Sequence, residues 1–143
     1  MKKLRVGVIG CGRISVMHLV PANYLEEAEL VWCCDIKEDR ARAIAEKYGI
    51  KAYTDYIEML DSGLVDAVLV ETPHYFHPEM VMECLKRGIH AVCEKPAGVY
   101  TKQVREMNEA AAKSNALFGM MFNQRTNCLY RKMKEMIAQY AAK

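Results

Sequence analysis

The 143-residue sequence has no apolar run long enough to cross a lipid bilayer. Even Ala116–Phe122, a wholly non-polar stretch, has only seven residues. The excess of charge is also small, with 20 basic residues against 18 acidic ones and no basic stripe. These absences argue against a membrane protein and against a surface that binds nucleic acid. We therefore expect neither a membrane nor a nucleic-acid partner.

The six cysteines lack the spacing of a metal site or a redox motif. No two of them form a C-x-x-C pair, and Cys33 and Cys34 are adjacent, so they should point to opposite faces of a strand. The apolar segment between Lys3 and Cys11 is too short to be the core of a signal peptide. We expect reduced, buried cysteines in a cytoplasmic protein that binds no metal.

Short apolar runs alternate with amphipathic segments along the whole chain. The apolar runs predict strands covered on both faces, over Leu4–Ile9, Ala28–Cys34, Lys51–Thr54, Asp66–Val70, His90–Cys93 and Ala116–Phe122. The amphipathic segments predict helices over Arg13–Leu19, Glu38–Tyr48, Tyr56–Leu60, Pro78–Arg87, Thr101–Ser114 and Asn127–Ala142. Pro21 should kink or break the first helix, with Ala22–Glu27 resuming it. The alternation predicts an α/β fold with a doubly wound parallel sheet in a single domain.

A glycine-rich turn follows the first predicted strand. It reads GCGRIS from Gly10 to Ser15, which is a G-x-G-x-x-S pattern between a strand and a helix. In such a turn the first glycine permits the tight bend, the second lets a pyrophosphate approach the backbone, and Ser15 packs helix against sheet. The start of the helix then offers N–H groups to phosphate. The pattern predicts a Rossmann-type domain that binds a dinucleotide through Gly10, Gly12, Arg13 and Ile14.

The second predicted strand ends at Asp35, 20 residues after Ser15. An acidic side chain at this point can accept hydrogen bonds from ribose hydroxyls, and it would repel a 2′-phosphate. The cofactor is therefore expected to be NAD rather than NADP, although Lys37 and Arg40 could weaken that preference. The alternative is an incidental glycine turn, which the acid in register disfavours.

Polar residues follow the third strong strand, Asp66–Val70. In the strand order 3-2-1-4-5-6 this strand lies beside the first, at the switch point where ligands bind. We predict that Thr72 and Pro73 contact the cofactor and that His77, at a helix start, lies near it. A metal site built on His74 and His77 would need further ligands that the sequence does not offer.

The tripeptide Glu94-Lys95-Pro96 follows the strand His90–Cys93. Lys95 would point into the same crevice as Gly10, where an ammonium group can bond a substrate hydroxyl and help its proton to leave as hydride departs. A surface Glu–Lys pair in a loop explains the position equally well.

Together these motifs resemble the glucose-fructose oxidoreductase, inositol dehydrogenase and rhizopine-catabolism family. The resemblance covers nearly the whole chain, and Glu94-Lys95-Pro96 is its most specific element. It implies that Lys95 is catalytic, near nicotinamide and substrate, and that Glu94 and Lys95 also line the cofactor site. It further implies that Asn123 and Arg125 lie near the cofactor. Glu71 departs from the family pattern, which has a small or apolar residue there.

The resemblance implies a second α/β domain after this one, carrying substrate-binding residues. Residues 1–122 are then the dinucleotide-binding domain, and residues 123–143 are a terminal helix that leads to the second domain. We expect an oxidoreductase that transfers hydride between NAD and a secondary alcohol of a sugar or cyclitol. The 143 residues alone should bind NAD but turn over poorly, because half of the substrate pocket is missing.

Two other functions stay open from the sequence. The chain could be the cofactor domain of an NAD-dependent glycoside hydrolase, which oxidises its sugar only transiently. It could also be a nucleotide-binding module without catalytic activity. An oligomer also stays open, because the resemblance implies that contacts between subunits commonly use the sheet of the second domain. The last helix carries an apolar side that a missing partner would leave exposed to adventitious association, formed by Leu129, Met133, Met136, Ile137 and Tyr140.

Overall fold

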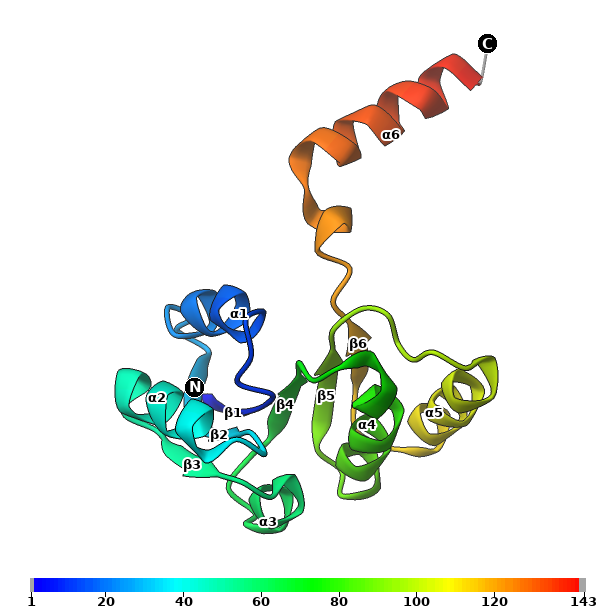
Figure 1. Cartoon of the computed structure of the whole chain (residues 1–143). Helices are drawn as coiled ribbons and strands as arrows, with labels where there is room; N and C mark the ends of the chain where they lie inside the picture. Colours follow the sequence, from blue (N-terminus) through cyan, green and yellow to red (C-terminus); the bar gives the residue numbers. More distant parts are fainter. Residues whose placement is uncertain (1, 142–143) are drawn as a thin grey trace.

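A computed structural model describes residues 2–141 (Figure 1). Six parallel strands form one sheet in the order β3-β2-β1-β4-β5-β6. The strands are β1 (Leu4–Ile9), β2 (Ala28–Cys34), β3 (Lys51–Tyr53), β4 (Ala67–Val70), β5 (His90–Cys93) and β6 (Phe118–Met120). The helices are α1 (Ser15–Ala22), α2 (Glu38–Tyr48), α3 (Tyr56–Asp61), α4 (His77–Lys86), α5 (Thr101–Lys113) and α6 (Cys128–Ala141), with 3-10 turns η1 (His74–Phe76) and η2 (Asn123–Thr126). The predicted doubly wound sheet and its strand order are confirmed.

Helices cover both faces of the sheet and enclose two apolar cores. One core lies under α1 and α2 and includes Val8, Leu19, Cys33 and Ile44. The other lies under α3, α4 and α5 and includes Cys34, Met59, Val81 and Met107. Cys33 and Cys34 fall in different cores, as their adjacent places on a strand predict. The continuous apolar runs of the sequence are therefore those of strands buried on both sides.

The first helix differs from its prediction around Pro21. Helix α1 includes Pro21 in its last turn, and Ala22–Glu27 forms no second helix. A proline costs a helix one backbone hydrogen bond and clashes with the preceding turn. Here that cost falls where the helix already ends, since the Asn23 N–H closes α1 on the Leu19 carbonyl at 3.0 Å. Pro21 thus sits at the end of one helix instead of separating two.

Strand β6 is shorter than the apolar run that predicts it. Within residues 2–141 it pairs with β5 alone, through three residue pairs from Ala91↔Phe118 to Cys93↔Met120. Leu117 and Phe122, which flank it, are exposed. The apolar run is longer than the strand because the paired register covers only Phe118–Met120, although the Leu117 carbonyl and the Met121 N–H still bond to Ala91 and Cys93 of β5. The other strand and helix limits agree with their predictions within one residue, apart from Ala142, which lies outside the described residues.

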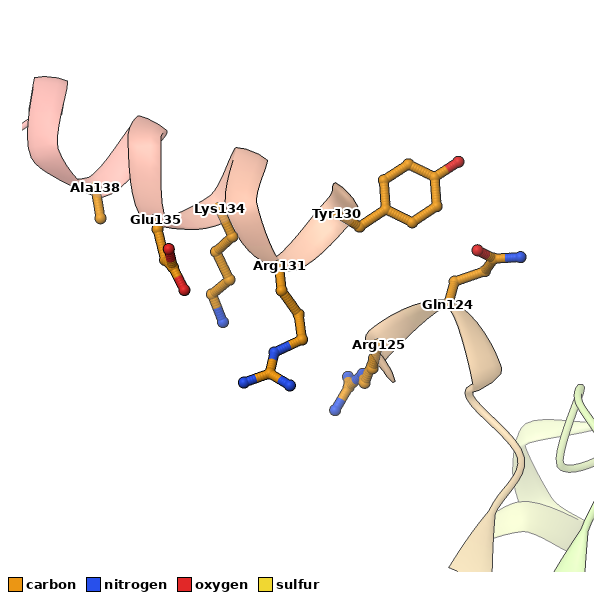
Figure 2. A pocket seen from close by; sticks show the side chains of 7 residues that line it. All are labelled: Gln124, Arg125, Tyr130, Arg131, Lys134, Glu135 and Ala138. Atoms are coloured by element: carbon orange, nitrogen blue, oxygen red, sulfur yellow. The ribbon is translucent and has the colours of Figure 1, made fainter. Parts of the chain in front are cut away.

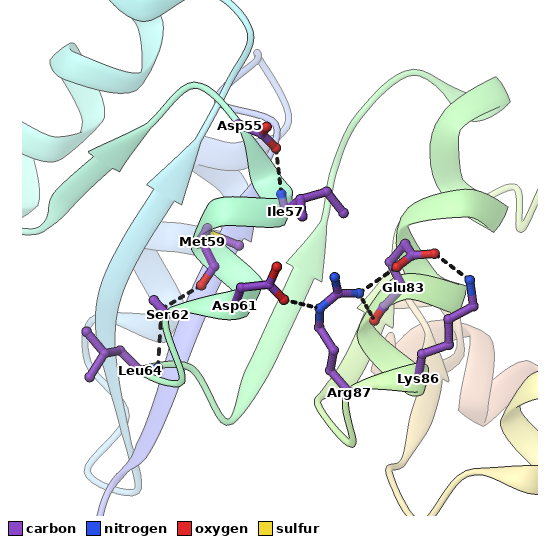
Figure 3. Close-up of polar contacts among 9 residues, drawn as sticks. All are labelled: Asp55, Ile57, Met59, Asp61, Ser62, Leu64, Glu83, Lys86 and Arg87. Atoms are coloured by element: carbon purple, nitrogen blue, oxygen red, sulfur yellow. Dashed lines mark hydrogen bonds and ion pairs between the residues drawn. The ribbon is translucent and has the colours of Figure 1, made fainter.

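Two sets of ion pairs join elements at the amino end of the sheet. Arg87 Nε donates to Asp61 Oδ1 at 2.6 Å, and Arg87 Nη1 donates to Glu83 Oε2 at 2.5 Å, which links α3 to α4 (Figure 3). Arg5 in β1 donates to Asp66, just before β4, and these bonds hold the pKa of the Asp66 carboxyl well below its usual range. These residues precede or begin strands, so they lie at the edge of the sheet where strands start.

Helix α6 projects away from the rest of the fold (Figure 1). It contacts η2, and all of its described residues are exposed. Its exposed apolar side chains include Leu129, Met133, Met136, Ile137 and Tyr140, the side that the sequence predicts to be apolar. None of the helices within residues 2–141 is long and apolar enough to span a membrane.

Candidate cofactor site

The glycine turn after β1 is held against the end of β4. Gly10 has a φ of 103°, and a Cβ at this position would lie 2.7 Å from the carbonyl carbon and oxygen of Glu71 and 2.9 Å from the Thr72 nitrogen. Both the backbone conformation and the lack of space exclude a larger residue. Gly10 is therefore required by the protein's own packing, before any ligand is considered.

The second glycine of the turn has the opposite surroundings. A Cβ at Gly12 would have no heavy atom within 4 Å, so this side of the turn is open. Ser15 Oγ donates to the Gly12 carbonyl at 2.7 Å and fixes the turn against the start of α1. Ile14 is the N-cap residue of α1, and its side chain makes no capping hydrogen bond. Open space beside an uncapped helix N-terminus is a cradle that fits a pyrophosphate, whose negative charge favours this helix end.

Asp35 connects the end of β2 to the same turn. Its Oδ2 accepts from the Cys11 N–H and its Oδ1 accepts from the Lys37 N–H, both at 2.9 Å. Sequence reasoning assigns Asp35 to a ribose and misses this bond to the glycine turn. A carboxylate can accept about four hydrogen bonds, so two acceptor positions remain for the ribose hydroxyls.

Two glutamates lie side by side where β4 and β5 end. Val70 pairs with Cys93 in register, so Glu71 and Glu94, which follow them, project from the same face of the sheet. Both side chains are buried, with exposed fractions of 5% and 6%. Neither carboxyl oxygen of Glu71 has a hydrogen-bond partner among the described residues. Burial, reinforced by the charge of Glu94, raises the pKa of Glu71 to about 8, so its carboxyl group is mostly protonated at neutral pH.

Glu94 has three close contacts instead. His18 Nε2 lies 2.7 Å from Glu94 Oε1, the Lys95 N–H donates to Oε2 at 2.9 Å, and Lys95 Nζ lies 3.9 Å from Oε2. The interpretation of Glu94 and Lys95 as a surface pair is therefore wrong for Glu94, which is buried. Lys95 itself is exposed, its side chain retaining 60% of its accessible surface. His18 is missed by sequence reasoning, because a lone histidine in a helix carries no motif of its own.

His77 begins α4 as predicted, but its ring is fully buried. Its Nδ1 lies 2.8 Å from the Pro96 carbonyl oxygen and its Nε2 lies 2.7 Å from the Thr72 carbonyl oxygen. His77 is predicted to lie near the cofactor, but its ring has no exposed surface through which to touch a ligand. His77 instead fastens the loop after β4 to the loop after β5, where the Lys95–Pro96 peptide bond is cis. Residues 2–141 contain no group of three or more His, Cys, Asp or Glu side chains that could hold a metal.

The remaining predicted residues divide between two places. Thr72 is half-buried beside Gly10, with its Oγ1 3.4 Å from the sulfur of Met80, and Pro73 is exposed next to it. Arg13 is exposed at the start of α1, within the glycine turn. These residues surround the edge of the sheet where β1 and β4 end, which is the ligand-binding edge of a doubly wound fold.

Asn123 and Arg125 lie elsewhere. They form part of η2, after the edge strand β6, so β4 and β5 separate them from the glycine turn. The Arg125 guanidinium stacks 5.0 Å from the centre of the Phe122 ring. A hollow of about 850 Å³ lies between η2 and α6, and Arg125, Arg131 and Lys134 extend toward it (Figure 2). The structure therefore does not bring these two residues together with Gly10 and Asp35.

These features define a class of protein. A six-stranded doubly wound sheet, an open glycine turn at the end of β1 and an acid at the end of β2 make a dinucleotide-binding Rossmann domain. The family model GFO_IDH_MocA, described as an oxidoreductase family with an NAD-binding Rossmann fold, matches residues 4–122. The chain belongs to this family, which confirms the predicted family, fold and cofactor.

Characterised relatives agree with this assignment. A myo-inositol 2-dehydrogenase of Thermotoga maritima is 37% identical over 135 residues, which are 94% of this chain and 40% of the relative. The crystal structure of a myo-inositol 2-dehydrogenase from Lactobacillus plantarum superposes with a TM-score of 0.91 at 30% identity, over 96% of this chain and 42% of that one. The WlbA dehydrogenase of Bordetella pertussis, crystallised with NADH and UDP-GlcNAcA, gives a TM-score of 0.92 at 29% identity, over 96% and 40%. The chain thus spans about 40% of the length of the relatives it matches.

Proposed function

We propose that this chain binds NAD along the edge of the sheet where β1 and β4 end, and that the whole protein transfers hydride between NAD and a secondary alcohol of a sugar or cyclitol. One observation carries the proposal. The open side of Gly12 and the exposed ammonium group of Lys95 lie on the same edge of one parallel sheet. A dehydrogenase needs two features on its cofactor domain, a phosphate-binding site and a group that assists proton transfer from the substrate hydroxyl.

Each residue has a distinct part in binding the cofactor. Gly12 and the start of α1 would hold the pyrophosphate. Asp35 would accept hydrogen bonds from the ribose hydroxyls while its other contacts keep the turn in place. Its negative charge opposes a 2′-phosphate, which supports NAD over NADP. Thr72 and Pro73 border the same crevice where the loop after β4 meets Gly10.

Lys95 is the proposed catalytic residue. NAD supplies the hydride acceptor when it is bound. The Lys95 ammonium can donate a hydrogen bond to the oxygen of a substrate alcohol and stabilise the negative charge that develops there as the hydroxyl proton passes to water. Glu94, buried beside it, keeps a compensating negative charge near this ammonium.

Residues 1–122 and 123–143 are proposed to have separate roles. The first segment is the dinucleotide-binding domain, and the second is a connection to a domain that holds the sugar or cyclitol. The exposed apolar face of α6 supports this division, as does the 40% coverage of the relatives. The 143-residue chain should therefore bind NAD but oxidise alcohols slowly, since substrate positioning supplies much of the rate. The six unpaired cysteines, five of them buried, support a reducing cytoplasmic location.

A titration of NAD and NADP against this chain tests the proposal. Trp32 is the only tryptophan, it lies on β2 three residues before Asp35, and its fluorescence should report occupancy of the adenosine end. We expect saturable quenching by NAD and weaker binding of NADP, with calorimetry as an independent measurement. The absence of saturable binding of either nucleotide by both methods would overturn the cofactor site.

A further inference from the structure

A histidine and a glutamate far apart in the sequence form a buried pair at the cofactor edge. His18 lies on α1 and Glu94 follows β5, and the His18 Nε2 to Glu94 Oε1 distance is 2.7 Å. Their side chains keep only 13% and 7% of their accessible surface. The pair has no place in the cofactor contacts described above, although it is one of the best-buried polar contacts at this edge.

The contacts of Glu94 fix its orientation. A buried carboxylate is costly unless hydrogen-bond donors compensate the lost water. His18 engages Oε1 and the Lys95 backbone N–H engages Oε2, so each oxygen has its own partner. With both oxygens held, Oε2 is directed toward Lys95 Nζ at 3.9 Å. The neighbouring Glu71 does not share these contacts, since its oxygens have no partner in the described part of the chain.

Lys95 itself has little else to order it. Its side chain is 60% exposed, and a long exposed side chain samples many rotamers. Glu94 Oε2 is the acceptor that the structure places near its ammonium group. The direction in which Lys95 points therefore depends on the orientation of Glu94.

We infer that His18 is a positioning residue for Lys95: it holds Glu94 in the orientation that keeps the lysine ammonium at the cofactor edge. The inference rests on the proposed function for its importance in catalysis, but the positioning itself is a property of this chain. Helix α1 also links the two ends of the site. It begins at Ser15, beside the phosphate cradle, and reaches His18 within its first turn.

Competitive acylation of lysines tests this inference without cofactor or turnover. A limiting amount of an amine-reactive acetylating reagent is added to the chain, and acetylation of Lys95 is compared with that of the exposed Lys102 by mass spectrometry. In His18→Leu, Glu94 loses a donor and holds the ammonium less firmly. Because an ion pair of this exposure contributes modestly, the Lys95 to Lys102 ratio should rise about two- to fivefold. His18→Gln, whose amide can still donate to Glu94, should restore most of the wild-type ratio.

Two controls separate positioning from a general loss of structure. Leu19→Ala removes a fully buried side chain next to His18 without touching Glu94, and it should lower the melting temperature but leave the ratio unchanged. If His18→Leu does not fold, Glu94→Gln removes the charge directly and should give the same rise. An unchanged or lower ratio in the folded His18→Leu variant, or in Glu94→Gln, overturns the inference. The proposed function fails separately, by the absence of NAD binding to the wild-type chain.

Discussion

Glu71 and Glu94 directly follow the paired residues Val70 and Cys93 at the ends of β4 and β5, and their carboxyl groups differ in hydrogen bonding. Glu94 receives hydrogen bonds at both oxygens, whereas Glu71 receives none from the described residues. Burial without a partner raises the pKa of Glu71 to about 8, so its carboxyl group is mostly neutral at pH 7. This difference leads directly to a pH dependence of stability.

The first prediction concerns Glu71 and pH. The unfolded carboxyl group releases its proton near 4.5, while the folded one keeps it until about pH 8. The unfolded state therefore binds fewer protons between these values, and the folded state loses stability as the pH rises from about 4.5 to 8, on the order of 3–5 kcal/mol in total. Glu71→Gln should flatten this dependence in urea unfolding at pH 5, 6.5 and 8. Glu46→Gln, on an exposed face of α2, is the matched control, and an equal slope in wild type and Glu71→Gln would contradict the prediction.

The second prediction separates the two glycines of the turn. Gly10→Ala forces an L side chain into positive φ and against the Glu71 backbone, so it should lower the free energy of unfolding by about 2–4 kcal/mol. Gly12→Ala meets no atom of the protein and should change stability by less than about 1 kcal/mol. Its methyl group would instead occupy the phosphate cradle and weaken NAD binding about tenfold or more. Urea unfolding and NAD titration followed by Trp32 fluorescence would measure both effects in both variants. Full NAD affinity in Gly12→Ala would contradict the assignment of Gly12 to the phosphate cradle.

The third prediction concerns Asp35. Asp35→Ala removes the ribose acceptor and the bond to the Cys11 N–H, so NAD affinity should fall by about tenfold or more. Asp35→Asn keeps one acceptor for the turn but removes the charge, so the preference for NAD over NADP should narrow. Calorimetric titration with both nucleotides measures the two effects, and unchanged NAD affinity in Asp35→Ala would exclude the ribose role.

The fourth prediction uses a pair of histidines three residues apart. His77→Leu removes the ring that links the Thr72 and Pro96 carbonyl groups, which should cost about 1–3 kcal/mol of stability. His74→Ala, in the exposed turn η1, should cost less than about 1 kcal/mol. Thermal and urea unfolding of the two variants checks this contrast. Similar losses in both would mean that the bridging bonds of His77 contribute little.

The parts of the structure that follow from local sequence were predictable. The spacing from Gly10 to Asp35 fixes a strand, turn, helix and strand, because each step is set by neighbouring residues. The burial of Glu94 and its contact with His18 were not predictable from local sequence. These two residues are 76 positions apart and meet only after three strands assemble. His77 shows the same limit: its place at a helix start is local, but the two carbonyl groups that surround it come from different loops.

The predicted limits of two elements, α1 and β6, differ from those in the structure. At Pro21 the sequence suggests an interruption between two helices, yet the preceding helix simply ends there. At Ala116–Phe122 the apolar run continues beyond the three residues that β5 can pair. In both cases the length of an element is set by a neighbour in space.

The ion pairs of Arg87 with Asp61 and of Arg5 with Asp66 lie where strands begin, opposite the cofactor edge. Exposed or half-exposed ion pairs therefore stabilise the edge where strands begin, whereas part-buried hydrogen bonds to Glu94 stabilise the cofactor edge. Added salt screens the first kind of contact much more than the second. Higher ionic strength should therefore weaken the ion pairs where strands begin more than the His18–Glu94 hydrogen bond at the cofactor edge.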